Sequence, residues 1–548
     1  MQFLRRGGGL MQKVESTGYA AQADLIAALR ENLRTTLNVK KVQLIETHIS
    51  WLLLAGKYAY KIKKAVNLGF LDFSSLTLRQ HYCAEEIRLN RRFAPSIYLD
   101  VVEVGGSAAH PMLNAEPVIE YAVRMRRFAV SRQFDHLLAR HKLLPAHIES
   151  LANTVAAFHR SLQSATEADT YGSAEAVSQH VWQNFEHLQS LLKSNDDLLG
   201  LEKLRNMTEL AYVACHAYLE QRLQQGFIRE CHGDLHLGNI VLIQDQAVPF
   251  DGIEFNPALR WIDVMSDVAF TVMDLLHQQR ADHAYRFLNV YLETTGDYAG
   301  LRVLHFYLSY RAMVRAKVAA IRIEQPSLTP RTAAKLRTTA RGYLKLAESC
   351  LSKSSPALII THGLPGSGKS TFAQLALERL QAIRLRSDVE RKRLYGLDRL
   401  ADSHQLAGVD LYSAEVTQHT YAQLKLMARE LLLAGFTVVV DAAFITQGER
   451  AAFRQLAQEM SIPFVIAAVH ASAESLRARI RLRQQAANDP SEADVSVMEK
   501  LRVNHDPLSA DEQLQSVIFL NEGQGIVADR AAWEQLDARL SGFNRGDS

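Results

Sequence analysis

The sequence predicts two successive large domains, the first of α+β class and the second of α/β class with a parallel sheet and flanking helices. The chain has 548 residues, more than one hydrophobic core usually holds. Before residue 131 alternating apolar and polar segments indicate strands, and from there to about residue 350 helical patterns dominate. After residue 357 short apolar runs alternate with helical stretches, which is typical of a parallel sheet with crossover helices.

The composition argues against several classes of protein. Hydrophobic residues make up 48% and charged residues 22% of the chain, the mixture of a globular rather than a disordered protein. The formal net charge of +3 does not call for nucleic acid or an anionic membrane as a partner. No apolar run reaches the roughly 18 residues that a membrane span needs. The four scattered cysteines form no CxxC pair, which fits a reducing, cytoplasmic compartment.

The domain boundary is predicted at a short polar segment. Ser352-Lys-Ser-Ser-Pro follows a helical pattern and precedes an apolar strand pattern, as linkers do. Within the first domain we expect a small lobe over about residues 21–125 and a helical lobe over about 126–350. The predicted parts are a flexible leader over residues 1–20, a first domain over 21–350, a linker over 351–356 and a second domain over 357–548.

Hydrophobic periodicity places the individual elements. In the first domain, period-two segments predict strands at residues 41–46, 50–55, 57–63, 98–104 and 118–125, with a helix at 78–93 between the third and fourth. In the second domain, apolar runs predict strands at residues 357–361, 382–385, 437–440 and 463–470.

One loop of the first domain carries a constellation suited to phosphoryl transfer. Cys231-His-Gly-Asp-Leu-His-Leu-Gly-Asn is followed by a strand, a turn and a second strand that ends at Asp251. Asp234 and Asn239 lie five residues apart, and a hairpin would return Asp251 to them. Phosphoryl transfer needs a carboxylate for the attacking hydroxyl, and an amide oxygen and a second carboxylate for magnesium.

This loop resembles the catalytic loop of the aminoglycoside phosphotransferase family, whose fold is a protein-kinase-like pair of lobes. The resemblance implies that Asp234 is the catalytic base and that Asn239 and Asp251 bind magnesium. It also implies that His232 braces the loop and that Asp267 supports it from a helix. Two alternatives remain: an Asp/Asn-rich turn without chemistry, and a transition-metal site at His232 and His236.

Upstream segments resemble the nucleotide-binding parts of the same family. Tyr58-Ala-Tyr-Lys-Ile-Lys-Lys is similar to the strand whose lysine contacts phosphates, with Lys61 as the best match and Lys63 as the alternative. Cys83-Ala-Glu-Glu resembles the helix whose acid pairs with that lysine, and either Glu86 or Glu85 could serve. The sequence departs from the family pattern because Glu46-Thr-His-Ile-Ser stands where a glycine-rich phosphate loop is expected.

The second domain opens with a complete phosphate-binding motif. Gly363-Leu-Pro-Gly-Ser-Gly-Lys-Ser matches G-x-x-x-x-G-K-[ST] between an apolar strand and a helix that continues from Thr371. Glycines turn backbone N–H groups toward phosphates, the lysine reaches the outer phosphates and the serine ligates magnesium. The predicted nucleotide-binding residues are Gly363, Gly366, Gly368, Lys369, Ser370 and Thr371, with Ser370 also a magnesium ligand.

Downstream residues resemble small-molecule and polynucleotide P-loop kinases, sequences to which the name AAA-type ATP-binding domain also attaches. Asp388 and Arg391 have the D-x-x-R spacing in which the aspartate activates an acceptor hydroxyl and the arginine binds substrate phosphate. Asp441 ends an apolar strand and would bind magnesium. Arg479 and Arg483 lie one turn apart on a lid-like helix and would meet the transferring phosphates. The alternatives are an N-capping aspartate, an ordinary strand-end acid and a solvated basic helix.

Together these features predict a bifunctional ATP-dependent kinase that uses Mg²⁺ and phosphorylates hydroxyl groups of small molecules. A nucleic-acid 5′-end kinase is an alternative for the second domain, although aromatic residues for stacking bases are sparse there. A regulatory protein that senses ATP through one domain is another. The sequence leaves the acceptors, the oligomeric state and any coupling of the two sites open.

Overall fold

The computed structural model of the protein describes residues 16–67, 71–166, 171–324, 328–401, 411, 413–486, 490–522 and 525–541. Contacts divide the chain into two compact units. Unit 1 comprises Met1–Ala176 and Arg222–Asp267, and unit 2 comprises Val177–Gln221 and Val268–Ser548. The predicted linker residues 351–356 lie outside the helices and strands, but they fall within unit 2 and not at a boundary between the units.

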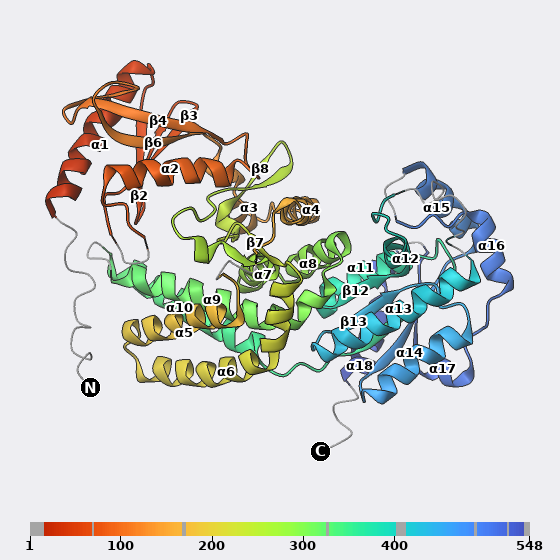
Figure 1. Ribbon diagram of the computed structural model, residues 1–548. Helices are drawn as coiled ribbons and strands as arrows, with labels where there is room; N and C mark the ends of the chain where they lie inside the picture. The colour runs from red at the N-terminus through yellow and green to blue at the C-terminus, as the bar shows by residue number, and fades with distance from the viewer. Residues whose placement is uncertain are drawn as a thin grey trace. The chain divides into compact units, whose positions relative to one another are not determined.

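An antiparallel sheet forms the N-terminal part of unit 1 (Figure 1). Its strand order is β1-β2-β3-β6-β4-β5, and all five predicted strands are present. Leu25, Leu29 and Leu33 of helix α1 pack into the core of this sheet. The bounds are α1 Ser16–Thr36, β1 Val42–Glu46, β2 Ser50–Ala55, β3 Tyr58–Lys63, α2 Leu76–Asn90, β4 Tyr98–Ser107, β5 His110–Leu113 and β6 Val118–Arg126.

Helix α1 begins at Ser16, inside the segment expected to be a leader, and residues 1–15 lie outside the described residues. Helix α2 begins where Ser75 caps it, because the Ser75 hydroxyl accepts a hydrogen bond from the Leu78 amide at 3.2 Å. The predicted helix at 78–93 is therefore present but shifted toward the N-terminus. This helix follows β3 and carries Glu85 and Glu86.

The rest of unit 1 contains the predicted loop and hairpin. Strand β7 (Ile228–Glu230) pairs with β10 (Trp261–Asp263), and β8 (Ile240–Ile243) pairs with β9 (Gln246–Pro249). Two helices, α3 (Phe134–Ala139) and α4 (Pro145–Ser161), precede them in the chain. The short 3-10 helices are η1 Val130–Arg132, η2 Leu237–Asn239 and η3 Pro257–Leu259.

Long helices form the first part of unit 2. Helices α9 and α10 pack along each other, and α8 contacts strand β12 and helix α11 of the following sheet domain. Helix α5 begins in unit 1 and continues in unit 2, and helix α6 lies in unit 2 until its last residues, which belong to unit 1. Helix α7 begins in unit 1 and continues in unit 2. The bounds are α5 Ala174–Leu191, α6 Asn195–Gln224, α7 Val264–His277, α8 Ala281–Thr295, η4 Tyr298–Gly300, α9 Leu301–Ile323 and α10 Pro330–Cys350.

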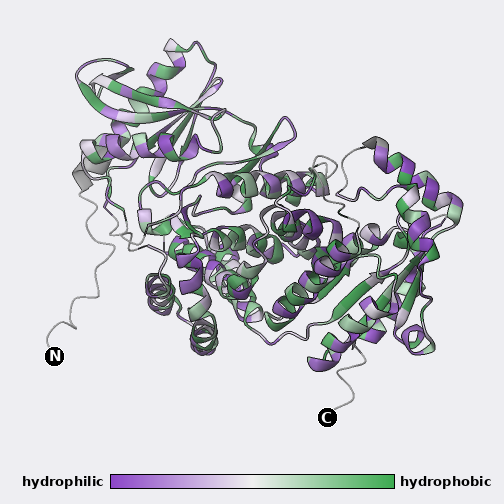
Figure 2. Ribbon diagram, turned by 45° about the vertical axis from the view of Figure 1, so that its right-hand side comes forward, coloured by the Kyte–Doolittle hydropathy of each residue, from purple (hydrophilic) through white to green (hydrophobic). Residues whose placement is uncertain are grey.

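A parallel sheet with strand order β12-β13-β11-β14-β15 forms the C-terminal part of unit 2, as predicted. Its strands are largely apolar, as the green arrows in Figure 2 show. Phe372, Phe519 and Trp533 pack as an aromatic group in its core. The strand bounds are β11 Leu358–His362, β12 Ile383–Arg386, β13 Val438–Asp441, β14 Phe464–His470 and β15 Ser516–Leu520, of which β15 was not predicted.

Helices connect these parallel strands, which is what right-handed crossovers require. Their bounds are α11 Lys369–Leu380, α12 Ser387–Leu394, α13 Ala414–Leu433, α14 Gln447–Glu459, α15 Ala473–Ala486, α16 Val495–Val503, α17 Ala510–Leu514, η6 Ile526–Ala528 and α18 Arg530–Ser541. Among the residues that the structure describes, no helix is both long and apolar enough to cross a bilayer. The mixed α+β and α/β class predicted from the sequence is confirmed.

Candidate active sites

The predicted catalytic loop of unit 1 runs from β7 to β8 and is held from below by a buried carboxylate. Asp267 Oδ2 accepts a hydrogen bond from the His232 amide at 3.1 Å, and Asp267 Oδ1 accepts one from the Gly233 amide at 3.0 Å. His159 Nε2 lies 3.2 Å from Asp267 Oδ2. Gly233 has φ +83°, and an added Cβ would lie 2.7 Å from the Leu259 carbonyl oxygen. The loop backbone is therefore tied in place, as the resemblance implied for Asp267.

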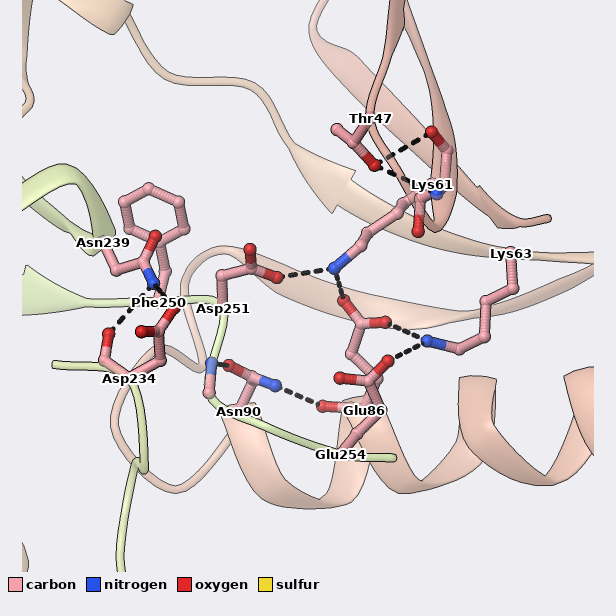
Figure 3. Close-up of polar contacts among 12 residues, drawn as sticks. Thr47, Lys61, Lys63, Glu86, Asn90, Asp234, Asn239, Phe250, Asp251 and Glu254 are labelled. Atoms are coloured by element: carbon pink, nitrogen blue, oxygen red, sulfur yellow. Dashed lines mark hydrogen bonds and ion pairs between the residues drawn. The ribbon is translucent and has the colours of Figure 1, made fainter. Parts of the chain in front are cut away.

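The three polar residues predicted on this loop lie close together (Figure 3). Asn239 Nδ2 donates to Asp234 Oδ2 at 2.9 Å and to the Asp234 carbonyl oxygen at 3.0 Å. The hairpin returns the chain as predicted, because the Phe250 amide donates to the Asn239 carbonyl at 2.8 Å and Asp251 follows. The Asp234 side chain is 35% exposed and the Asp251 side chain 45%, so both carboxylates remain accessible.

Asp251 begins a turn that the small lobe supports. It has φ +63°, and its amide donates to the Tyr98 hydroxyl at 3.0 Å. The next amide, that of Gly252, donates to Asn90 Oδ1 at 2.8 Å. Asn90 ends helix α2, so this contact joins the turn that carries Asp251 to the helix that carries Glu86. Sequence reasoning missed Tyr98 and Asn90, because their partners lie more than 150 residues away.

Lys61 and Lys63 share one buried carboxylate, and Figure 3 shows the resulting row of charges. Glu86 Oε1 lies 2.8 Å from Lys61 Nζ, and Glu86 Oε2 lies 2.8 Å from Lys63 Nζ. Lys61 also reaches Asp251 Oδ1 at 2.5 Å, whereas Lys63 also pairs with Glu254. Lys63 is completely buried and Lys61 is 13% exposed, so of the two lysines Lys61 lies toward the accessible carboxylates.

Lys61, Lys63 and Glu86 stabilise one another in their ionised forms, whereas burial raises the pKa of Glu254 above its usual value despite the charge of Lys63. Burial alone would lower the pKa of Lys61, but Asp251 and Glu86 outweigh it and raise that pKa well above its usual value. Burial would raise the pKa of Glu86, yet the two lysines hold it below its usual value. Glu85, the alternative to Glu86, instead pairs with Arg88 at 2.9 Å. The structure thus places Glu86, not Glu85, beside Lys61.

Thr47 lies at the place where the sequence lacks a glycine-rich loop. Its amide donates to the Ser50 carbonyl at 2.9 Å, and its hydroxyl oxygen accepts from the Ser50 amide at 3.0 Å. Ser50, at the end of this tight turn between β1 and β2, pairs with Lys63 of β3, two residues after Lys61. The turn keeps its shape through the threonine hydroxyl rather than through glycine flexibility.

Glu254→Gln is expected to lower the free energy of unfolding by about 3 kcal/mol, because it leaves the buried Lys63 charge without one of its two carboxylates. Chemical denaturation of the full chain measures this change. Glu31→Gln is the matched control, because Glu31 is 64% exposed in its pair with Arg34 and should change stability little. Equal effects of the two substitutions would contradict the role assigned to Glu254.

The transition-metal alternative for His232 and His236 gains no support from the geometry. His232 Nε2 lies 2.9 Å from the Phe250 carbonyl, and its Nδ1 accepts from the Asp234 amide at 3.3 Å. Within the described ranges, the only group of three or more His, Cys, Asp or Glu side chains close enough to share a metal ion is His159, Cys231 and Asp267, which are all buried. Asp267 already accepts hydrogen bonds from the His232 and Gly233 amides, so this group supports the loop. Both ring nitrogens of His232 also already have hydrogen-bond partners.

The phosphate-binding motif of unit 2 adopts the conformation that its glycines predict. Gly366 and Gly368 have φ +84° and +105°, and an added Cβ at Gly368 would lie 2.1 Å from Asn521 Nδ2. Lys369, the first residue of α11, donates from Nζ to the Leu364 carbonyl at 2.9 Å, across the loop. The loop therefore curves around a space that backbone N–H groups and the start of a helix face, which suits phosphate groups.

A cavity of about 930 Å³ gathers nearly all the residues predicted for this site. Gly363 does not line it, and a Cβ added at Gly363 would lie 2.5 Å from the Val469 carbonyl oxygen. Arg479 extends to the Asn521 carbonyl at 2.6 Å, and Arg483 reaches the Ala493 carbonyl. The predicted residues that line the cavity are Gly366, Gly368, Lys369, Ser370, Thr371, Asp388, Arg391, Asp441, Arg479 and Arg483.

Two carboxylates face this cavity and fit different tasks. Burial would raise the pKa of Asp388, but Arg391, a hydrogen bond from Ser491 and the charge of Arg386 keep it below its usual value. Asp388 is therefore ionised and can accept a proton. Asp441 is 4% exposed, and its Oδ2 accepts no hydrogen bond from the described residues. A buried carboxylate oxygen that accepts no hydrogen bond, in the cavity that Ser370 also lines, suits a hard cation such as Mg²⁺.

The cavity also contains residues that sequence reasoning missed. Arg386 Nε lies 3.6 Å from Asp441 Oδ2, and Lys392 Nζ lies 2.6 Å from Glu492 of the segment before α16. That segment includes Ser491 and follows the lid-like helix α15. Arg386 stands in the same basic run as Asp388, so its position was a usable signal. The contact of Glu492 with Lys392 could not be predicted, because no motif in the sequence near Glu492 indicates it.

The free energy of unfolding is expected to fall by about 3 kcal/mol as the pH drops from about 6.5 to about 4, through His362. Burial lowers the pKa of His362 to about 4, so the unfolded chain binds a proton in this range and the folded chain does not. Denaturation of wild type and His362→Gln at several pH values tests this, since the substitution should remove that part of the pH dependence. An unchanged pH profile in His362→Gln would assign the effect to other groups.

A family model and several known proteins are similar to this chain or to parts of it. A family model described as an AAA domain matches residues 358–508, which confirms the predicted AAA-type ATP-binding domain. An uncharacterized protein of Mycobacterium tuberculosis (strain ATCC 25618 / H37Rv) is 30% identical over 417 residues, 76% of this chain and 80% of that protein. An uncharacterized protein of Mycobacterium bovis matches to the same extent.

Several solved structures are similar to parts of the chain. Choline kinase from Cryptosporidium parvum Iowa II matches 60% of this chain and 96% of its own, with 11% identity and a TM-score of 0.38. Kti12 of Chaetomium thermophilum, in complex with ADP-AlF3, matches 34% of this chain and 100% of its own, with 19% identity and a TM-score of 0.27.

Proposed function

The chain belongs to one family with these uncharacterized mycobacterial proteins, and from this premise we propose that it is a bifunctional ATP-dependent kinase. Each of its two sites would transfer the γ-phosphate of ATP to a hydroxyl group of a small molecule. The observation that carries the proposal is that each compact unit contains a full set of lysine and carboxylates for this reaction. The two sets belong to different folds, so neither is a copy of the other.

In the site of unit 1, Lys61 would contact the nucleotide phosphates while Glu86 holds its ammonium group in place. Asp234 would accept the proton of the attacking hydroxyl as the new oxygen–phosphorus bond forms and the bond to the β-phosphate oxygen breaks. The hydrogen bond from Asn239 Nδ2 fixes the Asp234 carboxylate for this step. Oxygen atoms of Asn239 and Asp251 would hold Mg²⁺, which neutralises phosphate charge when bound.

In the site of unit 2, the loop from Gly363 to Ser370 would hold the phosphates and Lys369 would contact the outer ones. Asp388 would take the proton of the acceptor hydroxyl, and Arg391, 3.5 Å away, would bind an anionic group of the acceptor. Ser370 and Asp441 would hold Mg²⁺. Arg479 and Arg483 would stabilise the charge on the transferred group from the lid helix α15.

A small acceptor is favoured over a nucleic-acid end by the lining of this cavity. Tyr421 is the one aromatic side chain among the described residues that line it, whereas base stacking uses several aromatic rings. Residues Ser491–Asp494 of the lid segment also line the cavity, which limits the space for a polymer. The volume of about 930 Å³ accommodates a nucleotide and a metabolite-sized molecule.

Transfer of labelled phosphate from ATP to a panel of sugars, amino alcohols and 5′-hydroxyl oligonucleotides tests the proposal. We expect labelled small molecules, with one product lost in Asp234→Asn and another in Asp388→Asn. Labelling of oligonucleotides alone, abolished by Asp388→Asn, would indicate the end-kinase alternative instead. Nucleotide binding without any transfer would indicate an ATP-sensing role.

A further inference from the structure

A helix from outside the predicted second domain meets the edge of its parallel sheet. Strand β12 is an edge strand, and Asn289 of helix α8 binds its backbone in both directions. The Arg384 amide donates to Asn289 Oδ1 at 2.7 Å, and Asn289 Nδ2 donates to the Ala382 carbonyl at 3.0 Å. Figure 1 shows α8 beside α11 and β12. The amide side chain thus satisfies polar groups that an edge strand otherwise leaves open.

One turn further along α8, Glu293 places a buried negative charge against the same strand. It is 1% exposed, and its Oε1 accepts from Arg384 Nε at 2.9 Å and Nη2 at 2.6 Å. Its Oε2 lies 4.0 Å from Arg386 Nη1 and 3.8 Å from Arg399 Nη1. Burial would raise the pKa of Glu293, but these arginines keep it below its usual value, so the carboxylate is charged.

Arg386 lies between this carboxylate and the proposed magnesium ligand of unit 2. Its partner across the sheet is Asp441 of β13, and its Nε lies 3.6 Å from Asp441 Oδ2. A guanidinium that paired fully with Asp441 would compete with a metal ion for that carboxylate. Glu293 attracts the same guanidinium from the opposite side, so its charge reduces that competition.

We infer that Glu293 is a positioning residue for the P-loop site, holding Arg386 away from full pairing with Asp441 so that Asp441 can bind Mg²⁺. This inference rests on the proposed function of that site. It makes helix α8, which precedes the phosphate-binding loop by about 70 residues, a component of the second active site. The second site then extends beyond the predicted boundary at residues 351–356, because α8 precedes that boundary in the chain.

The test measures the Mg²⁺ concentration that half-saturates nucleotide binding at the second site. It uses the full chain carrying Asp251→Ala, so that the first site contributes little. Glu293→Gln should raise this midpoint about threefold or more, because Arg386 shifts onto Asp441. In a chain that also carries Arg386→Met, the same substitution should produce no further shift. Glu293→Asp, which keeps the charge, should shift the midpoint less than Glu293→Gln. If Glu293→Gln does not fold, Glu293→Asp is compared with the wild-type side chain in its place.

Glu512→Gln is the matched control, because Glu512 forms a buried ion pair with Arg450 at 2.8 Å and does not line the cavity. It should lower stability without moving the Mg²⁺ midpoint. Equal midpoints for Glu293→Gln and Glu512→Gln, or an undiminished shift in the Arg386→Met background, would overturn the inference. Absence of any Mg²⁺-dependent nucleotide binding that Lys369→Ala removes would instead overturn the proposed function of this site.

Discussion

Asp234→Asn is expected to lower turnover at the first site by about a hundredfold or more while leaving nucleotide affinity unchanged. The amide keeps the size of the side chain, and its oxygen can still accept the hydrogen bond from Asn239 Nδ2. It cannot take the proton of the attacking hydroxyl. Lys61, Asn239 and Asp251, which would contact phosphates and metal, remain in place. Steady-state phosphate transfer together with calorimetric nucleotide titration measures both quantities.

Asp245→Asn is the control for this substitution, because Asp245 lies in the turn of the neighbouring hairpin and is 83% exposed. It should match wild type in rate and affinity. If Asp234→Asn transferred phosphate at the wild-type rate, the loop would not be catalytic. Unit 1 would then be better interpreted as a nucleotide sensor for the kinase of unit 2.

Lys369→Ala is expected to weaken nucleotide binding at the second site by about tenfold to a hundredfold, the value of a charge-assisted hydrogen bond. Lys369 Nζ now lies against the Leu364 carbonyl and would exchange that contact for phosphate oxygens. Calorimetry should therefore record two nucleotide sites per chain in wild type and one strong site in the variant. Asp251→Ala should weaken the other site, which distinguishes the two.

Lys353→Ala provides a control with the same loss of a lysine, since Lys353 is exposed, precedes the phosphate-binding motif by ten residues and does not line the cavity. It should retain both sites. A single site in wild type that disappears in Lys369→Ala would remove unit 1 from the proposed enzyme activities. Two sites that both persist in Lys369→Ala would contradict the assignment of the P-loop.

Contiguous motifs were predictable because their shape depends on neighbours in the chain. The loop from His232 to Asn239 and the motif from Gly363 to Ser370 both adopt the expected turns, and the hairpin brings Asp251 back to Asn239. Glycine conformations and short hydrogen bonds determine such segments locally. The strand alternation predicted both sheets for the same reason, although it missed β5 in the first sheet and β15 in the second.

The sequence could not distinguish between neighbouring candidate residues. Both Lys61 and Lys63 lie on one strand face, and only the position of α2 shows that they share Glu86 while Glu85 turns to Arg88. Helical spacing alone makes Glu85 and Glu86 equally plausible, because which face of α2 meets the sheet depends on packing.

The sequence by itself therefore determined the two kinds of fold and the residues of each motif. Only the tertiary structure decided which buried charges support those motifs. Glu254 pairs with Lys63 across 191 residues of chain, and Glu293 pairs with Arg384 across 91. The physical reason is that a buried charge must find an opposite charge wherever the packed elements bring one, and no local pattern in the sequence records that partner.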